Sequence, residues 1–192
     1  MVVADASVIR AGKTSVVVDA GIYEVNENSA HQISTIGSAM MTFSRLIRRD
    51  DTPVLQADDN LNNKINFAIG GSGLTQSIID KIGVIIINGA KGVIELKSSS
   101  YIRNSFNVVH GGMIAVLSDT AGQITAREAT GRPMVTSDLT IHYLAQGKYG
   151  PFRTRAKILR ITDDTVLTRI ELIDRGADDR LISIAMNTST LP

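Results

Sequence analysis

The second half of the chain consists largely of short apolar runs with the spacing of β-strands. Between residues 135 and 143, Leu139, Ile141 and Tyr143 alternate with polar residues, which is the pattern of a strand with one buried face. Further runs rich in Val, Ile and Thr, bounded by turn-forming residues, predict strands at 92–100, 152–161, 165–173 and 180–190. Because the last three are separated by short turns, they predict an antiparallel meander.

Residues 110–129 break this strand pattern. The segment has no Pro and is apolar almost all round, through residues such as Met113, Leu117 and Ile124, so it predicts a long helix that is buried in the protein. A second, shorter helix is predicted at 74–83. One long buried helix together with several antiparallel strands indicates an α+β fold.

The strand pattern of the C-terminal meander also occurs near the N-terminus. Ile9-Arg10 and Ser15-Val16-Val17 match Leu159-Arg160 and Thr165-Val166-Leu167 at one constant offset, and a third strand aligns after a longer loop in the first copy. The alternative is that two β-rich segments look alike by chance. We interpret residues 1–45 as a partial repeat of three strands, 46–73 as a linker and 74–192 as a complete domain. Since the first copy has no counterpart of the long helix, we expect residues 1–45 to be the tail of a domain whose front half is missing. A fragment of a longer tandem protein is one alternative that this leaves open.

Composition excludes several classes of function. Twenty Lys and Arg nearly balance 19 Asp and Glu, for a formal net charge of +1, whereas nucleic-acid binding needs a clustered excess of cations. The absence of Cys removes disulfides, thiolate metal sites and cysteine nucleophiles. No His, Asp and Glu residues have metal-ligand spacing, and no apolar stretch reaches the roughly 18 residues of a membrane span. We therefore expect a cytoplasmic protein with no metal, cofactor, nucleic-acid or membrane partner.

One stretch carries the pattern of a chemical site. His110-Gly111-Gly112 stands at the start of the long helix, where the first backbone N–H groups have no intrahelical partner. Glycines there allow a substrate carbonyl to approach those N–H groups, which makes an oxyanion site. Asp119 follows about two helical turns later and so lies on the same helix face. The alternatives are a simple tight turn at the glycines and a structural role for Asp119.

The combined motifs are more specific than any one of them. Asn104-x-x-Asn107-x-x-His110-Gly111-Gly112, then Leu117-Ser118-Asp119-Thr120-Ala121 and Val135-Thr136-Ser137-Asp138-Leu139, resemble the PaaI-like branch of the hotdog-fold acyl-CoA thioesterases. This resemblance implies an antiparallel sheet wrapped around a long central helix. It also implies edge-to-edge dimers with active sites at the dimer interface, and hence a homo-oligomer, a dimer or tetramer of hotdog units.

The same resemblance implies a role for each motif residue. Asp119 is expected to be the catalytic base or nucleophile, and Asn104 and His110 to help place the water and the thioester. The backbone N–H of Gly112 is expected to polarise the thioester carbonyl. Thr136 occupies the place of a hydroxyl that assists from the partner subunit's strand.

Further residues are expected to contact the substrate, an acyl-CoA. Gly111 is the other of the two glycines at the start of the long helix, and we call this pair the glycine entrance. Asn107 stands where the family usually has Gly, and Asn tolerates a positive φ better than most residues, so the turn is expected to survive. Lys148 and Arg153 are candidates for the CoA phosphates.

Two other functions remain open at this stage. Hotdog hydratases and dehydratases act on enoyl or hydroxyacyl thioesters and share the scaffold, although the His-Gly-Gly pattern favours hydrolysis. A non-catalytic acyl-CoA sensor, or a degenerate half of a tandem protein, is the other alternative.

Overall fold

A computed structural model of the chain describes residues 2–25, 33–45 and 75–192. The predicted linker, residues 46–73, lies outside the described residues. The chain divides into two compact units, Met1–Thr52 and Pro53–Pro192, which are described one at a time below.

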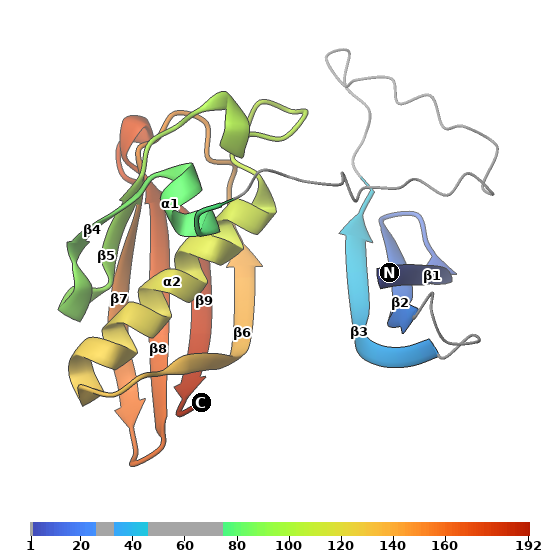
Figure 1. Cartoon of the computed structure of the whole chain (residues 1–192). Coiled ribbons are helices and arrows are strands. Elements are labelled where there is room, and N and C mark those ends of the chain that lie inside the picture. The colour runs from blue at the N-terminus through green and yellow to red at the C-terminus, as the bar shows by residue number, and fades with distance from the viewer. Residues whose placement is uncertain (1, 26–32, 46–74) are drawn as a thin grey trace. The chain divides into compact units, whose positions relative to one another are not determined.

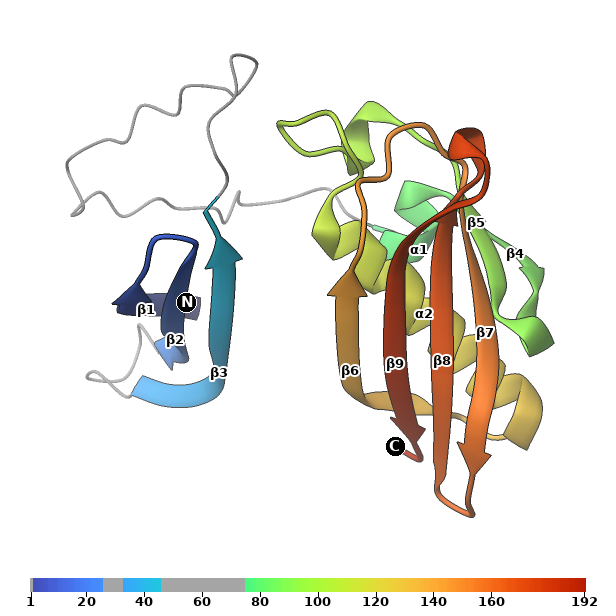
Figure 2. The same cartoon turned by 180° about the vertical axis from the view of Figure 1, so that it is seen from behind.

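The C-terminal unit is one long helix laid across one face of an antiparallel sheet (Figure 1). The six strands are ordered β4-β5-β7-β8-β9-β6, so β4 and β6 form the two edges. Seen from behind, the other face of the sheet carries no helix of the described residues (Figure 2). Its elements are α1 (Ile78–Ile82), β4 (Val84–Asn88), β5 (Val93–Leu96), α2 (Gly111–Thr130), β6 (Val135–Tyr143), β7 (Phe152–Ile161), β8 (Thr165–Asp174) and β9 (Arg180–Thr190). Single turns of 3-10 helix occupy Gly89–Lys91, Ser100–Ile102 and Arg175–Ala177.

The core of this unit lies between α2 and the sheet. Leu117 and Ala121 of α2 are fully buried in one apolar cluster with sheet residues Ile170, Leu172 and Ala185. Burying each large aliphatic side chain contributes about 1.5–3 kcal/mol, so this contact fixes the position of α2 and of every functional side chain that it carries.

The sequence predicted most of these elements. The strand at 135–143 and those at 152–161 and 180–190 are confirmed with the same bounds, the strand at 165–173 extends by one residue, and the long helix is α2. The prediction of a strand over 92–100 was wrong at its end, because the chain leaves the sheet after Leu96 and turns at Ser100. The predicted helix at 74–83 is only the short α1, which ends at Gly83 in a left-handed conformation (φ 77°). Strand β4 was missed, since its run of isoleucines lacks the alternation of a half-buried strand.

The N-terminal unit is a three-stranded antiparallel sheet of β1 (Val2–Ala11), β2 (Ser15–Val25) and β3 (Ile33–Ser44). Its irregularities coincide with those of the C-terminal meander. The β1–β2 register shifts between Val8 and Arg10, and the β7–β8 register shifts between Ile158 and Arg160. The β2–β3 and β8–β9 registers also shift at equivalent positions, Ile22/Tyr23 and Leu172/Ile173. Matching bulges are features of backbone geometry, so the two meanders resemble each other in structure as well as in sequence.

Candidate active site

The loop before α2 is held in shape by Asn104. Its side-chain oxygen accepts hydrogen bonds from the backbone N–H groups of Phe106 (3.0 Å) and Val108 (3.3 Å), and its backbone N–H donates to the carbonyl of Val108. Asn107 occupies the turn with φ 57°, so the expectation that Asn replaces Gly at a positive φ is confirmed. The amide oxygen of Asn104 is thus engaged in the turn, and its NH₂ group is the part that can face a substrate.

Arg103 connects this loop to the rest of the unit, a role that the sequence did not reveal. Its guanidinium donates to the backbone carbonyl of Asn107 (2.5 Å) and to the side-chain oxygen of Asn107 (3.2 Å). The same group donates to Ser98 Oγ (2.7 Å) and to the backbone carbonyl of Lys148 (2.7 Å). Because these partners come from three separate segments, Arg103 fixes the position of the loop that leads into His110 and α2.

His110 is the N-cap residue of α2. Its backbone is extended (φ −66°, ψ 136°), and its Nδ1 accepts a hydrogen bond of 3.0 Å from the backbone N–H of Gly112. Since Nδ1 is the acceptor, the neutral ring carries its proton on Nε2. The N–H that the sequence assigns to the thioester carbonyl is therefore in contact with the imidazole. The N–H of Gly111 has no hydrogen-bond partner in the described part of the chain.

The glycine entrance is exposed on one side and bordered by an aromatic ring on the other. Gly112 is exposed and Gly111 is half-buried. A Cβ added at Gly111 would lie 3.6–3.7 Å from the ring of Tyr143, whose hydroxyl donates to the Gly111 carbonyl at 3.2 Å. Tyr143, at the end of β6, is itself 58% exposed and so forms one wall of the entrance.

Asp119 projects from α2 as a half-buried carboxylate. Its Oδ2 accepts a hydrogen bond from Gln123 Nε2 at 2.8 Å, one helical turn further on, where side chains of the same face meet. None of the described cations forms an ion pair with it. The preceding Ser118 is fully buried, and its hydroxyl has no hydrogen-bond partner among the described residues. The carboxylate of Asp119 is thus oriented by an amide and is not paired with a cation of the described residues.

Thr136 lies on β6, an edge strand of the sheet. Its hydroxyl accepts a hydrogen bond of 2.8 Å from Asn187 Nδ2, and Asn187 is fully buried on β9. A Cβ at Gly122 would come within 2.5 Å of Asn187 Cγ, so this glycine allows α2 to pass close to that amide. Within one chain Thr136 therefore lies beside the C-terminal half of α2, away from the His-Gly-Gly entrance.

The two predicted phosphate contacts differ in their surroundings. Lys148 is exposed, and its backbone joins the His-Gly-Gly loop through Arg103. Arg153 is paired with Glu95, with nitrogen–oxygen distances of 2.5 and 2.8 Å. The charge of Arg153 is thus already neutralised within the protein.

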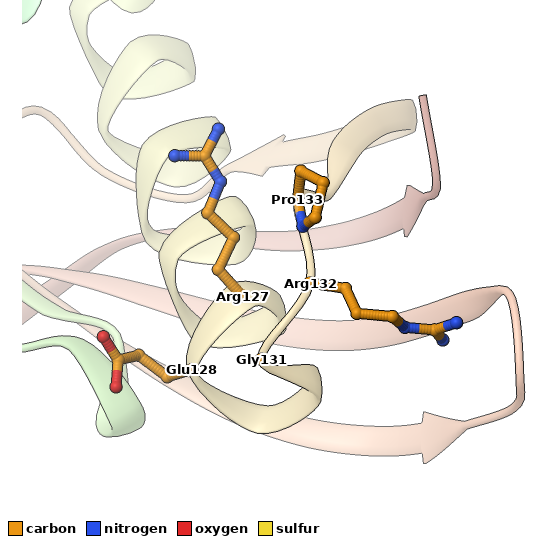
Figure 3. Close-up of a pocket in the computed structure, with 5 residues that line it drawn as sticks. All are labelled: Arg127, Glu128, Gly131, Arg132 and Pro133. Carbon is orange, nitrogen blue, oxygen red and sulfur yellow. The ribbon is translucent and has the colours of Figure 1, made fainter.

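A surface hollow at the other end of α2 is not part of this constellation. It is lined by Arg127, Glu128, Gly131, Arg132 and Pro133 at the C-terminus of the helix (Figure 3). The Arg132 guanidinium donates to the backbone carbonyl of Asp163. Over the described residues, no group of three or more His, Cys, Asp or Glu gathers as a metal site would require. No described helix has the length and apolarity to cross a membrane.

The part of the chain that holds this geometry matches known proteins. Residues 106–179 match the family model of the Thioesterase superfamily. Over 103 residues the chain is 31% identical to a provisionally named esterase of Saccharolobus solfataricus, an alignment that covers 52% of this chain and 72% of the relative. The chain belongs to the thioesterase superfamily. The match begins in the loop before α2, so it includes His-Gly-Gly and Asp119 of this thioesterase-superfamily member.

Solved structures show that the fold is the hotdog fold, as the sequence predicted. The Escherichia coli PaaI protein from the phenylacetic acid degradation operon is similar with a TM-score of 0.56 and 21% identity, over 62% of this chain and 86% of that one. The thioesterase HI1161 of Haemophilus influenzae gives a TM-score of 0.54 and 20% identity, over 60% of this chain and 82% of that one. The C-terminal unit therefore has the hotdog fold of these proteins.

The structure brings together one continuous set of the predicted residues. A single assembly of turn and helix cap at the start of α2 contains Asn104, Asn107, His110, Gly111 and Gly112. Asp119 lies further along the same helix. Thr136 and Arg153 stand apart from this assembly within one chain. Four residues that contact the predicted site residues were not recognised as site residues from the sequence: Arg103, Gln123, Asn187 and Tyr143. Of these, only Gln123 had a usable signal, the helical spacing to Asp119.

Proposed function

We propose that this member of the thioesterase superfamily hydrolyses an acyl-CoA thioester to the free acid and CoA. The observation that carries the proposal is a half-buried, unpaired carboxylate, Asp119, on the helix whose N-terminus is the bare Gly111-Gly112 entrance. The acyl-CoA substrate class follows from the resemblance to the PaaI-like branch, and it is supported by the similarity to the Escherichia coli PaaI fold.

The backbone N–H of Gly112 is proposed to activate the thioester carbonyl. A hydrogen bond to the developing oxyanion in a preorganised site is worth about 3–4 kcal/mol in other hydrolases. Because His110 Nδ1 accepts the same N–H at 3.0 Å, the imidazole must give up this bond when the carbonyl arrives. Its Nε2–H then remains free to donate to the substrate or to the attacking water, which suits the proposed positioning role of His110.

Asp119 is proposed to act as general base on water, or as the nucleophile itself. The helical rise between Gly112 and Asp119 is about 10 Å, a gap that accommodates a carbonyl group and one intervening water. This spacing favours the general-base pathway within one chain. The water gives its proton to the Asp119 carboxylate and attacks the carbonyl carbon, after which the carbon–sulfur bond breaks and CoA leaves as thiolate. General-base assistance contributes about a hundredfold to ten-thousandfold in rate.

We further propose that the complete site needs a second copy of the chain. Thr136 lies on the open edge strand β6 and, within one chain, beside Asn187 rather than His110. Pairing two β6 edges would bring the Thr136 hydroxyl of one copy toward the helix of the other, as the family resemblance implies. Lys148, exposed beside the loop, is the better candidate for a CoA phosphate, and Arg153 is left out because Glu95 already neutralises it.

A thiol-release assay on a panel of acyl-CoAs tests the function. Hydrolysis liberates free CoA, which a thiol-reactive dye reports. A hydratase acting on an enoyl-CoA would instead change the absorbance of the conjugated thioester and release no thiol. A sensor would bind the panel by calorimetry and release no thiol. Absence of thiol release from every chain length, with binding intact, would refute the hydrolase proposal.

A further inference from the structure

One face of the N-terminal sheet is apolar across all three strands. The registers place its residues in four cross-strand rows, each with one residue from β1, β2 and β3. The rows are Ala4-Ile22-Gly37, Ala6-Ala20-Ala39, Val8-Val18-Met41 and Ala11-Val16-Phe43. The opposite face is mixed, with Asp5, Asp19 and Arg10 among its residues. An apolar face of this extent on a three-stranded sheet requires a covering element.

The C-terminal unit shows what covers the equivalent face. Its matching rows are Thr154-Leu172-Ser183, Ala156-Ile170-Ala185, Ile158-Thr168-Asn187 and Ile161-Val166-Ser189. Most of these residues are fully buried, and α2 packs against all three strands. Since the bulges of the two meanders coincide, the two faces have the same pleat and twist, and a helix that fits one backbone fits the other.

Large side chains on the N-terminal face remain accessible. Val8 is 61% exposed, Phe43 is 53% exposed and Met41 is 37% exposed. Only Ala20, in the central row, is classed as buried there. Three small residues, Ala6, Ala20 and Ala39, cross the middle of the face and would let a helix backbone approach closely.

The described residues contain one long apolar helix, α2, but two sheet faces that such a helix could cover, one on β1–β3 and one on β7–β9. Helix α2 is already buried on its own sheet through Leu117 and Ala121, so a second copy of the chain brings one more helix and two more faces. The outer edge of β3 is also unpaired within the N-terminal sheet, whereas its counterpart β9 pairs with β6. Among the described residues, the N-terminal sheet therefore lacks a helix followed by a strand, in the order of α2 and β6.

We propose that the apolar face of β1–β3 is a docking surface for the helix-bearing half of a second hotdog unit. The partner is a polypeptide from outside this chain that carries an apolar helix built like α2 and a strand that pairs with the edge of β3. Its helix needs no polar group to match Thr168, Asn187 and Ser189 of the C-terminal sheet, because Val18, Met41 and Phe43 take their places on this face.

The test appends residues 75–151 of this chain directly before Val2 of the full chain. Because residue 151 precedes Phe152, the equivalent of Val2, the fusion restores the element order of the C-terminal unit and supplies the helix at high effective concentration. Amide hydrogen exchange is then compared between the extended and the original chain. We expect the amides of β1–β3 to exchange at least tenfold more slowly in the extended chain, and the appended helix to be protected.

Two adjacent valines provide matched variants. Val18 lies on the apolar face and Val17 on the other, paired with Arg10 and Thr42. In the extended chain Val18→Asp should abolish the added protection, and Val17→Asp should leave it. Both variants are also made in the original chain, where equal exchange in β1–β3 shows that the sheet itself still folds.

Two results would overturn this proposal. In the first, β1–β3 and the appended helix stay unprotected while the original α2 remains protected. In the second, sedimentation of the original chain shows dimers in which β1–β3 is already protected and which Val18→Asp dissociates. That second result would mean that two bare sheets cover each other, with no helix involved.

Discussion

Removing the Arg103 side chain tests whether the loop before α2 is positioned by one residue. Arg103→Ala deletes hydrogen bonds to three segments: two to Asn107, one to Ser98 and one to the Lys148 carbonyl. A hydrogen bond to a charged group is worth about 1.5–3 kcal/mol when buried. At this half-exposed site we take less than 1 kcal/mol for each, so the free energy of unfolding should fall by about 2–3 kcal/mol. In a domain of this size that lowers the Tm by about 4–12 °C.

The catalytic consequence of Arg103→Ala separates positioning from simple stability. Without the Arg103 side chain, the His-Gly-Gly turn is no longer held in a fixed position relative to Asp119. A displacement of about 1 Å at such a site can cost a hundredfold in rate. We expect kcat/KM for acyl-CoA hydrolysis to fall about tenfold to a hundredfold at a temperature well below the melting transition.

Arg169 offers a matched control for this experiment. It forms a half-exposed ion pair with Glu171 on β8, at 2.5 Å, and contacts no residue of the proposed site. Arg169→Ala should leave kcat/KM within about twofold of the original value and change stability by less than about 1 kcal/mol. If Arg103→Ala retained full activity, or lost no more than Arg169→Ala, the positioning role would be wrong.

Three further substitutions test single contacts. Gln123→Ala removes the donor that orients Asp119 and should lower kcat about threefold to tenfold with a smaller change in KM; steady-state kinetics would show the reverse split if Gln123 only binds substrate. Gly122→Ala places a Cβ 2.5 Å from Asn187. The overpacking costs about 1–3 kcal/mol and outweighs the gain in helix propensity of about 1 kcal/mol. Denaturant unfolding should show a net loss of stability, and this loss should be smaller when Gly122→Ala is combined with Asn187→Ala. Asn107→Gly loses one hydrogen bond from Arg103 but keeps φ 57° without strain. Asn107→Val loses the same bond and tolerates this φ poorly, so it should lower the Tm further; equal melting curves for the two variants would contradict this.

The sequence was sufficient for features that depend on neighbours along the chain. Three features follow from local rules: the apolar, Pro-free sequence of α2, the glycines at its start and the positive φ of Asn107. The repeat of the strand pattern was also visible, and the coincident bulges now extend it to the backbone.

Contacts between distant segments could not be read in the same way. Nothing in the sequence pairs Arg103 with the Lys148 carbonyl, or Gly122 with Asn187, because each contact depends on how the strands and α2 pack. The His110 cap on Gly112 was also missed, since His is not among the preferred N-cap residues. These contacts determine which backbone donors are free, so the electrostatics of the site required the structure.

The most direct test of the account is thiol release by Asp119→Asn compared with the unchanged chain. The substitution keeps the shape of the side chain and its contact with Gln123, but it removes the charge that accepts the proton of water. With an unchanged melting curve, the rate of acyl-CoA hydrolysis should fall by about a hundredfold or more. A rate within threefold of the original would show that this carboxylate does not carry the reaction, and the central claim would be wrong.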